Sequence, residues 1–272
     1  MAEPLLRIEG LAKKFGGVIA SDDITLDVAA GELHAVIGPN GAGKTTLIGQ
    51  LAGEIPPDAG RITFAGRDIT ALTTPTRSAL GLARSFQITS LFPDFTALDN
   101  VALAVQAHAG HSFRFWGDAR SAAELREPAH TALARVGLAA RADAVVSRLS
   151  HGEHRQLELA MTLATRPRLL LLDEPMAGLG PEESARVVKL LRELKQELTI
   201  LLIEHDMEAV FALADRITVL VYGRVIASGA PDAIRANADV RQAYLGEQTV
   251  VTAQGSDQGS GHGSGHGSGH GR

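Results

Sequence analysis

The sequence of 272 residues contains no cysteine. This absence excludes a disulfide scaffold and any metal site built on thiolates, and it fits a reducing cytosol. The first residues lack the apolar run of a signal peptide, and no stretch approaches the roughly 18 apolar residues of a membrane span. The densest apolar run, Leu169–Leu172, stops at two acidic residues. We therefore expect any membrane role to come from docking onto a partner.

Positive charge and aromatic residues are also scarce. The formal net charge is −5 at pH 7, which gives no electrostatic reason to expect nucleic acid as a partner. Aromatic residues make up 4% of the sequence, yet Phe113, Phe115 and Trp116 cluster with basic residues in segment 108–120. Such a mixture can stack on bases, but a docking surface or a partly buried loop explains it better. We expect a protein contact there and no nucleic acid.

The end of the sequence, residues 248–272, is rich in glycine and is expected to be a disordered tail. His262, His266 and His270 recur every four residues within it. They could form a weak metal-binding tail, or the segment could be a solubilising or artificially added tail. Glycine denies these histidines a shared helix face, which favours the second interpretation.

The remaining pattern predicts an α/β fold. Short strand-like runs open the sequence, and a buried strand at 32–38 runs into a glycine-rich loop and a helix that ends at Gly53. From about Ser90 to Ser147 the pattern is helical and rich in alanine; after that, strands and helices alternate. Alternation of this kind predicts a parallel sheet covered by helices. The helical stretch interrupts the order and is interpreted as an inserted subdomain.

The glycine-rich loop reads GPNGAGKTT and matches the phosphate-binding loop pattern, with the required strand before it and helix after it. Glycines let successive backbone N–H groups turn inward on phosphate oxygens, and the helix N-terminus adds its positive dipole end. Lys44 is expected to reach the β- and γ-phosphates, and Thr45 to supply a hydroxyl to Mg²⁺. The alternative to a phosphate-binding loop is a glycine turn before a helix, with no ligand. The predicted ATP-binding residues of the loop are Gly38, Pro39, Asn40, Gly41, Ala42, Gly43, Lys44, Thr45 and Thr46.

The string LLLLDEP supplies the second half of a nucleotide site. An apolar strand would deliver Asp173 to the metal side of the phosphates, and the adjacent Glu174 could polarise a water aimed at the γ-phosphate. Two acids after a strand are often only a turn, but together with the loop they indicate a P-loop ATPase or GTPase.

The string LSHGEHRQLELA resembles the signature sequence of ABC ATPases. Three further residues fall in the order that this family requires: Gln87 at the Q-loop position, His205 at the switch-histidine position, and Phe15 at the position that stacks on adenine. Taken singly, residues of these types are usually surface or core residues without a specific function. The resemblance implies catalytic roles for Glu174, His205 and Gln87 and metal contacts from Thr45, Gln87 and Asp173. It implies that the signature residues Ser150, His151, Gly152 and Glu153 cap the ATP of an opposite subunit.

The resemblance also implies a fold and a set of partners. The fold is a P-loop (RecA-like) parallel-sheet core with an N-terminal antiparallel β subdomain and an inserted α-helical subdomain. The expected ranges are 1–87 and 161–247 for the core and 88–160 for the helical subdomain. The ligands are ATP and Mg²⁺. The partners are a second ABC ATPase subunit (a homo- or heterodimer), transmembrane permease subunits and, indirectly, a substrate-binding protein, which places the chain peripherally on the cytoplasmic face of the membrane.

Within the ABC family, residues 5 to about 247 look like the ATP-binding subunit of branched-chain amino acid importers, the LivG type. Urea, amide and lipopolysaccharide systems use related subunits and stay open as alternatives. The sequence departs from the common pattern at His151, Glu153 and Gly180. Gly180 stands where an aspartate or asparagine is usual, which puts the strength of coupling between two sites in doubt.

Two other classes compete with a transport ATPase. A soluble ABC ATPase of DNA repair or translation needs long coiled-coil insertions or two ATPase units in one chain, whereas this sequence has one phosphate loop and no heptad run. A P-loop kinase would leave the signature string and His205 without a role. We therefore expect an ATPase that powers import.

Overall fold

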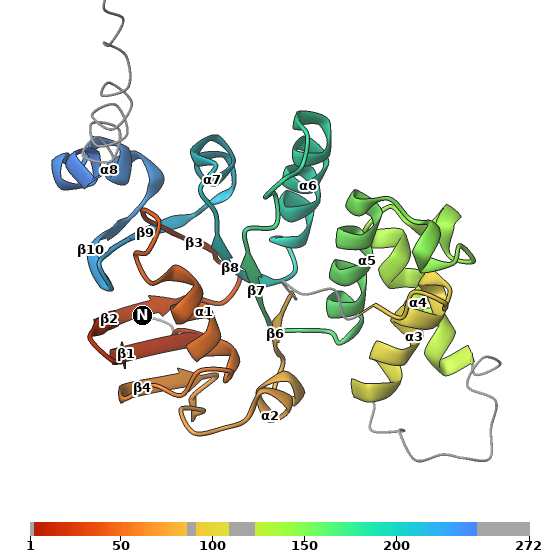
Figure 1. The fold of residues 1–272 in the computed structure, drawn as a ribbon, viewed down its shortest axis with the longest axis horizontal. Coiled ribbons are helices and arrows are strands. Elements are labelled where there is room, and N and C mark those ends of the chain that lie inside the picture. Colours follow the sequence, from red (N-terminus) through yellow and green to blue (C-terminus); the bar gives the residue numbers. More distant parts are fainter. Residues whose placement is uncertain (1–2, 86–90, 109–122, 244–272) are drawn as a thin grey trace, which may run out of the picture.

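The computed structural model describes residues 3–85, 91–108 and 123–243 (Figure 1). Three features of the sequence lie outside these ranges: Gln87, the aromatic cluster around Trp116, and the glycine-rich tail.

The strands and helices that the sequence pattern predicts appear in the predicted order, and further elements join them. The strands are β1 (Leu6–Phe15), β2 (Val18–Val28), β3 (Leu33–Ile37), β4 (Ala59–Phe64), β5 (Arg67–Asp68), β6 (Leu82–Arg84), β7 (Leu169–Asp173), β8 (Thr199–Ile203), β9 (Arg216–Val221) and β10 (Arg224–Gly229). The helices are α1 (Lys44–Ala52), α2 (Thr74–Ala79), α3 (Ala97–His108), α4 (Ala123–Arg135), α5 (His151–Ala164), α6 (Pro181–Leu194), α7 (Met207–Leu213) and α8 (Pro231–Ala236), with short 3-10 turns η1 (Ala139–Arg141) and η2 (Val146–Arg148).

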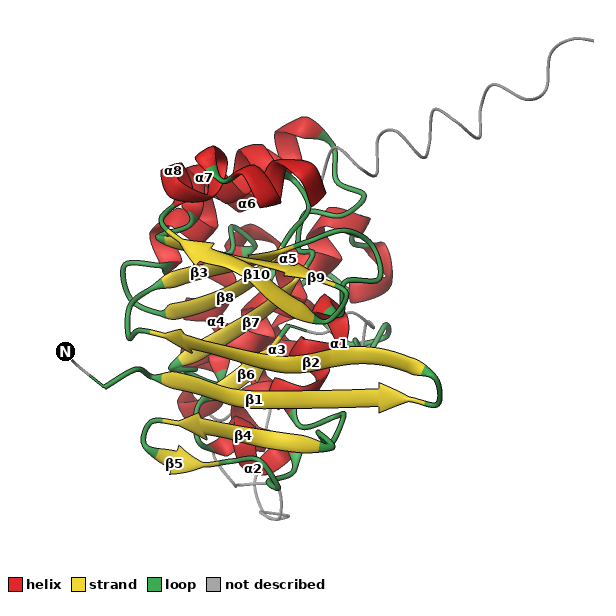
Figure 2. Cartoon of the chain, turned by 90° about the vertical axis from the view of Figure 1, so that its left-hand side faces the viewer, coloured by secondary structure: helices red, strands yellow, loops and turns green. Residues whose placement is uncertain are grey.

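Two sheets form the scaffold (Figure 2). The first is antiparallel, with the strand order β2-β1-β4-β5. The second has the order β10-β9-β3-β8-β7-β6, and its strands are parallel except for β10, which joins β9 antiparallel at the edge. This arrangement confirms the predicted fold class, a parallel-sheet core with an antiparallel β subdomain and a helical region. The edge strand β10 was not predicted.

Two element ends show how glycine sets boundaries. Gly16 has φ +57 and lets the chain turn from β1 directly into β2, so β2 begins at Val18 and is longer than the pattern alone predicts. The predicted end of α1 at Gly53 is confirmed: this residue has φ +84, and its N–H bonds to carbonyls of the last turn.

Helix α1 lies between the two sheets, where Leu47 and its apolar neighbours pack with β1 and β2 on one side and with β7 and β8 on the other. Strand β7 serves two cores because its side chains alternate between the faces of the sheet. Leu169 and Leu171 face α1, whereas Leu170 and Leu172 pack with the helices on the opposite face. Both faces of β7 are therefore covered, which fixes the strand end that carries the predicted acids.

Helices α3, α4 and α5 form a helical region beside the sheets (Figure 1). Their apolar faces share one core cluster with α6 and with the far face of the parallel sheet. Helix α5 continues to Ala164, so it runs across position 160, where the sequence analysis ends the helical subdomain. The ranges 1–87, 88–160 and 161–247 stay a prediction about domain organisation.

Arg77 fastens the C-terminal end of α1. Its guanidinium donates to four carbonyls, those of Gln50 (2.6 Å), Leu51 (2.7 Å), Thr70 (2.9 Å) and Leu72 (2.9 Å). Burial lowers the pKa of Arg77 from its ordinary value, but a guanidinium stays charged in proteins. The charge faces the negative end of the α1 dipole. The helix that begins with the phosphate loop is therefore anchored at its other end.

We expect Arg77→Met to destabilise the protein by about 2–4 kcal/mol, because four carbonyls would lose their donor. Arg77→Lys should cost less than the methionine variant, since an ammonium keeps the charge but cannot reach all four oxygens. Urea unfolding measures both. The exposed Arg67 on β5 is the control, and Arg67→Met should change stability by less than about 0.5 kcal/mol. Equal stability of Arg77→Met and the unchanged protein would contradict the anchoring role.

Candidate active site

The predicted phosphate loop joins β3 to α1 and is clamped between two strands. A Cβ on Gly38 would lie 2.0 Å from the carbonyl oxygen of Leu220, and one on Gly43 would lie 2.1 Å from that of Ala20. Gly43 also has φ +100, which residues with a side chain rarely adopt. Only glycine fits these two positions, because the neighbouring backbone occupies the space of a side chain.

The tip of the loop is open, while its end is braced. Asn40 and Gly41 are exposed. Ala42 is buried, and its carbonyl accepts a hydrogen bond of 2.9 Å from the N–H of Gly223 in the turn after β9. The loop therefore presents its tip outward from a fixed base.

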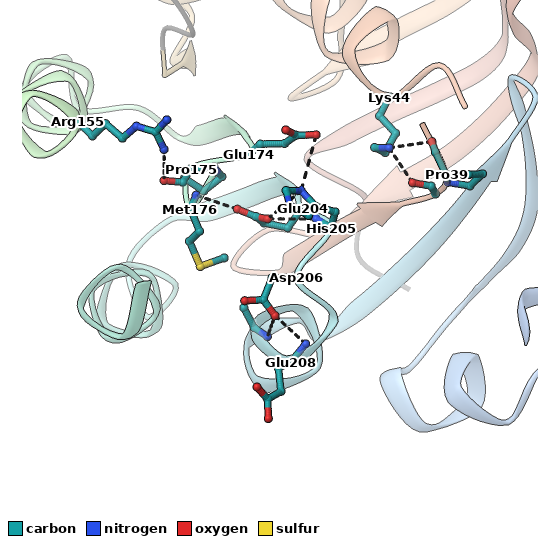
Figure 3. Close-up of polar contacts among 12 residues, drawn as sticks. Pro39, Lys44, Arg155, Glu174, Pro175, Met176, Glu204, His205, Asp206 and Glu208 are labelled. Atoms are coloured by element: carbon teal, nitrogen blue, oxygen red, sulfur yellow. Dashed lines mark hydrogen bonds and ion pairs between the residues drawn. The ribbon is translucent and has the colours of Figure 1, made fainter. Parts of the chain in front are cut away.

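Lys44 is the first residue of α1, and its side chain folds back across the loop (Figure 3). Its Nζ donates to the carbonyls of Gly38 at 2.7 Å and Pro39 at 2.9 Å. Burial raises the pKa of Asp173, and the ammonium lies near enough to that carboxyl to offset a small part of this rise. Thr45–Thr46 follow in the first turn of the helix. A buried cation thus sits at a helix N-terminus, where backbone amides and the dipole favour an anion.

Asp173 ends β7 with a side chain that is 2% exposed. Arg84 of β6 donates to its Oδ2 at 2.9 Å and also pairs with Glu54. Burial raises the pKa of Asp173, and the charge of Arg84 offsets part of this shift. A carboxylate beside the hydroxyl-bearing start of α1 is the kind of oxygen ligand that Mg²⁺ takes in nucleotide sites. The chemistry of these two side chains, a hydroxyl and a carboxylate, is compatible with such a metal, and the assignment of Thr45 and Asp173 as its ligands stays a prediction.

Glu174 occupies a strained backbone conformation. Its φ is +50, in the left-handed region that costs a residue with a side chain on the order of 1 kcal/mol. Two hydrogen bonds stabilise this strained conformation. The Glu174 N–H donates to the Ile203 carbonyl (2.9 Å), and the Ala177 N–H donates to the Glu174 carbonyl (3.1 Å). The chain turns sharply out of β7 at this residue, and its carboxylate faces His205 (Figure 3).

Glu204, at the end of β8, joins the two loops that carry Glu174 and His205. Its side chain is fully buried. Oε1 accepts from the Met176 N–H at 2.8 Å and Oε2 from the His205 N–H at 3.1 Å (Figure 3). One carboxylate therefore satisfies a backbone donor in each loop and holds the loops together.

His205 is placed where it can meet a ligand. Its side chain is 63% exposed, and Nδ1 lies 4.0 Å from Glu174 Oε1 and 3.8 Å from Glu204 Oε2. The next residue, Asp206, caps α7 by accepting from the N–H groups of Glu208 and Ala209. The cap sets the start of α7, and the backbone of the loop places the imidazole on the same side as Glu174.

Phe15 lies at the end of β1 in an exposed apolar tip. It is 49% exposed, and its neighbours Val18 and Ile19 across the turn are 66% and 45% exposed. Lys13 Nζ lies 5.4 Å from the ring centroid. Strand β2 pairs with β1, and the Ala20 carbonyl of β2 lies against Gly43 of the phosphate loop. The Phe15 ring therefore lies in the same region as that loop. An open aromatic face of this kind can stack on a base.

The signature residues begin α5. Ser150 is the N-cap: its Oγ accepts from the Glu153 N–H at 3.3 Å, and Glu153 Oε2 accepts from the Ser150 N–H at 2.7 Å. This reciprocal pair is a capping box. His151 is exposed and Gly152 is half-buried. Helices α5 and α1 lie on opposite sides of β7 (Figure 1), so one chain does not bring its signature to its own phosphate loop.

Glu183 links the signature to the loop before α6. A Cβ on Gly152 would lie 2.8 Å from Glu183 Oε1, while Glu183 Oε2 accepts from the Gly180 N–H at 3.3 Å. Glycine at position 152 therefore leaves room for the Glu183 carboxylate, whereas an alanine there would require the end of the Glu183 side chain to shift. Gly180 has no side chain to offer a neighbouring subunit, and the prediction that this weakens coupling stays a prediction.

A cleft of about 520 Å³ separates α5 from α6. Ser150 and Glu174 both line it. Arg155 of α5 donates from Nη1 to the Pro175 carbonyl at 3.2 Å (Figure 3). The signature helix is thus connected by a polar contact to the loop that carries Glu174.

Sequence reasoning missed Glu204 and Arg84. Glu204 gave a weak signal, because an acid directly after a buried strand needs a partner. Arg84 gave none, since its partner Asp173 lies 89 residues away and only the pairing of β6 with β7 brings them together.

Comparisons with known proteins show the family of the chain. The ABC transporter family model matches residues 21–177, and a model of branched-chain amino acid ATP-binding cassette transporters matches residues 224–249. LivG of Escherichia coli K12, a high-affinity branched-chain amino acid transport ATP-binding protein, is 39% identical over 91% of this chain and 100% of its own. BraF of Pseudomonas aeruginosa, with the same description, is 39% identical over the same shares.

Solved structures show the same fold. The ADP conformation of an ATP-binding cassette from an ABC transporter superimposes with a TM-score of 0.79 and 29% identity, covering 90% of this chain and 100% of that one. A nucleotide-free ATP-binding cassette from an ABC transporter superimposes with a TM-score of 0.77 and 28% identity. The match covers 89% of this chain and 99% of that one. No helix in the described part of this chain has the length and apolar character needed to cross a membrane.

We expect Glu204→Ala to destabilise the protein by about 2–4 kcal/mol, because the buried N–H of Met176 and the partly buried N–H of His205 would lose their acceptor. Glu204→Gln keeps one acceptor oxygen and should cost less. Urea unfolding measures the difference, and Glu208→Ala on the exposed side of α7 should change stability by less than about 0.5 kcal/mol. Stability of Glu204→Ala equal to that of the Glu208 control would show that Glu204 does not join the loops.

Proposed function

The chain belongs to the ATP-binding subunits of ABC transporters, and from this premise we propose that its Lys44 loop binds Mg²⁺-ATP and that Glu174 drives hydrolysis. ABC ATPases couple hydrolysis to transport. One observation carries the assignment to these residues: Lys44, Asp173 with the adjacent Glu174, and His205 come from three separate segments and gather at one edge of the parallel sheet.

Each residue has a defined part in this proposal. The loop amides and Lys44 hold the β- and γ-phosphates, and Phe15 stacks on adenine. Mg²⁺, held by Thr45 and Asp173, would neutralise charge on the phosphate oxygens; Gln87 is proposed as a further contact. Glu174 orients a water toward the γ-phosphate and accepts its proton. His205 contacts the γ-phosphate and reports its presence to α7.

Transport requires a second ATPase subunit. Because α5 and α1 lie on opposite sides of β7, we propose that Ser150, His151, Gly152 and Glu153 cap ATP held by the phosphate loop of a partner, either a copy of this chain or a related one. The Ser150 hydroxyl accepts a bond from within the turn and keeps its own proton for a phosphate oxygen. ATP then holds two subunits together, and hydrolysis releases them.

The proposed transport is import of branched-chain or related hydrophobic amino acids. The family model at residues 224–249 and the likeness to LivG and BraF support it. The chain would dock on the cytoplasmic face of permease subunits and meet a substrate-binding protein only through them. Reconstitution with the permease and uptake of labelled leucine would test this cargo, and uptake of urea instead would contradict it.

We expect Glu174→Gln to bind ATP with unchanged affinity, because the amide is nearly isosteric with the acid. Its turnover should fall by about a hundredfold or more, the range typical of losing a general base. Phosphate release measures turnover, and a fluorescent ATP analogue measures binding. The matched control is Glu182→Gln in the exposed first turn of α6. Hydrolysis by Glu174→Gln at the rate of this control would show that Glu174 is misassigned.

We expect Ser150→Arg to abolish ATP-driven dimerisation while leaving ATP binding by the monomer intact, because Lys44 and Thr45 are untouched. The bulky cation would push the signature turn off a partner's γ-phosphate. Size-exclusion chromatography with ATP, in the Glu174→Gln background, measures the dimer. Thr131→Arg, on an exposed position of α4, is the control. Loss of monomer binding with dimerisation intact would contradict the shared site.

A further inference from the structure

The signature turn carries an acidic side chain directly beside the hydroxyl expected to meet phosphate. Glu153 cannot swing away from Ser150, because its Oε2 accepts from the Ser150 N–H at 2.7 Å as part of the capping box. The carboxylate is therefore a fixed component of the turn.

A fixed carboxylate is an electrostatic obstacle at this place. The hydrogen bond from the Ser150 backbone holds the pKa of Glu153 below its usual value, and the charge of Arg141 lowers it further, so the group is ionised at neutral pH. Under the proposed function, the turn closes on the triphosphate of a partner. Like charges repel across a contact, and the repulsion grows as water leaves the interface. An uncompensated Glu153 would oppose closure.

Arg141 supplies the compensating charge. It ends η1, and its Nε lies 3.0 Å from Glu153 Oε1. Its Nη2 donates to the Arg148 carbonyl at 3.5 Å, so the guanidinium also lies against the segment that leads into the signature. Its side chain is 44% exposed and that of Glu153 is 25% exposed. An exposed pair of this kind contributes little to the stability of a monomer.

We propose that Arg141 is a positioning residue of the signature: it neutralises Glu153 and holds the carboxylate in the capping box, so that the turn can approach the partner's γ-phosphate. The inference rests on the proposed function, since it requires the signature to close on a second subunit. Arg141 acts through Glu153 and does not itself contact the phosphate. The competing possibility, a direct contact between the guanidinium and the phosphate, is separated by the experiment below.

The experiment measures ATP-driven dimerisation of four proteins, all in the Glu174→Gln background: the background alone, Arg141→Ala, Glu153→Gln, and the double variant. Arg141→Ala should raise the protein concentration needed for half-maximal dimerisation by about tenfold, because each signature keeps an unpaired carboxylate. In the Glu153→Gln protein, adding Arg141→Ala should raise this half-maximal concentration by less than about threefold. The reason is that the charge that required compensation is gone.

Two controls isolate the effect. Arg126→Ala breaks a comparable pair in the helical region, Arg126 Nη1 to Asp99 Oδ1 at 3.3 Å, and should leave dimerisation unchanged. Binding of a fluorescent ATP analogue by monomeric Arg141→Ala should also be unchanged, which shows that the variant is folded and that its own pocket works.

Each other outcome overturns the inference. Arg141→Ala could weaken dimerisation equally whether position 153 carries glutamate or glutamine. That result would mean that the guanidinium contacts the phosphate directly. No loss in either background would mean that the pair has no role in closure. If the Glu174→Gln background itself binds ATP but never dimerises, the proposed shared site fails, and this inference fails with it.

Discussion

Strands β3, β8 and β7 lie side by side and parallel, so their carboxyl ends meet at one edge of the sheet. Every element of the phosphate site depends on this adjacency. The loop to α1 leaves β3, Glu174 follows β7, and His205 follows β8. Packing on both faces of the parallel sheet stabilises this strand order. Helix α1 fills the space toward the antiparallel sheet, and α6 covers the other face.

The same edge concentrates features that cost stability. Asp173 is a buried acid whose pKa is raised by burial, Glu174 sits in a left-handed conformation, and Glu204 is a buried carboxylate. Each is compensated locally, by Arg84 or by backbone hydrogen bonds. Strain and buried charge persist in a fold only where the surroundings over-determine them, and here the two packed faces of the sheet do so.

The signature turn obeys a different constraint. It is well capped within its own chain, yet it lies on the far side of β7 from the loop proposed to bind phosphate. Its polar groups therefore have local partners for folding and further capacity for a second molecule. Glu153 and Arg141 form an ion pair in this turn. Under the proposed function, the carboxylate that stabilises the helix start would also be an anion placed toward a partner's phosphate.

The sequence by itself determined the fold class, the order of the elements and the residue types of the site, because glycine positions, strand–loop–helix periodicity and acids after apolar runs are local signals. It could not determine Arg77, Arg84 or Arg141 as partners of α1, Asp173 and Glu153. The first two pairings join segments far apart in the chain, and the third depends on how η1 packs beside the start of α5. Nor could the sequence show the strain at Glu174. Such contacts exist only once strand order and helix packing place distant backbone side by side, and that is decided by the tertiary structure.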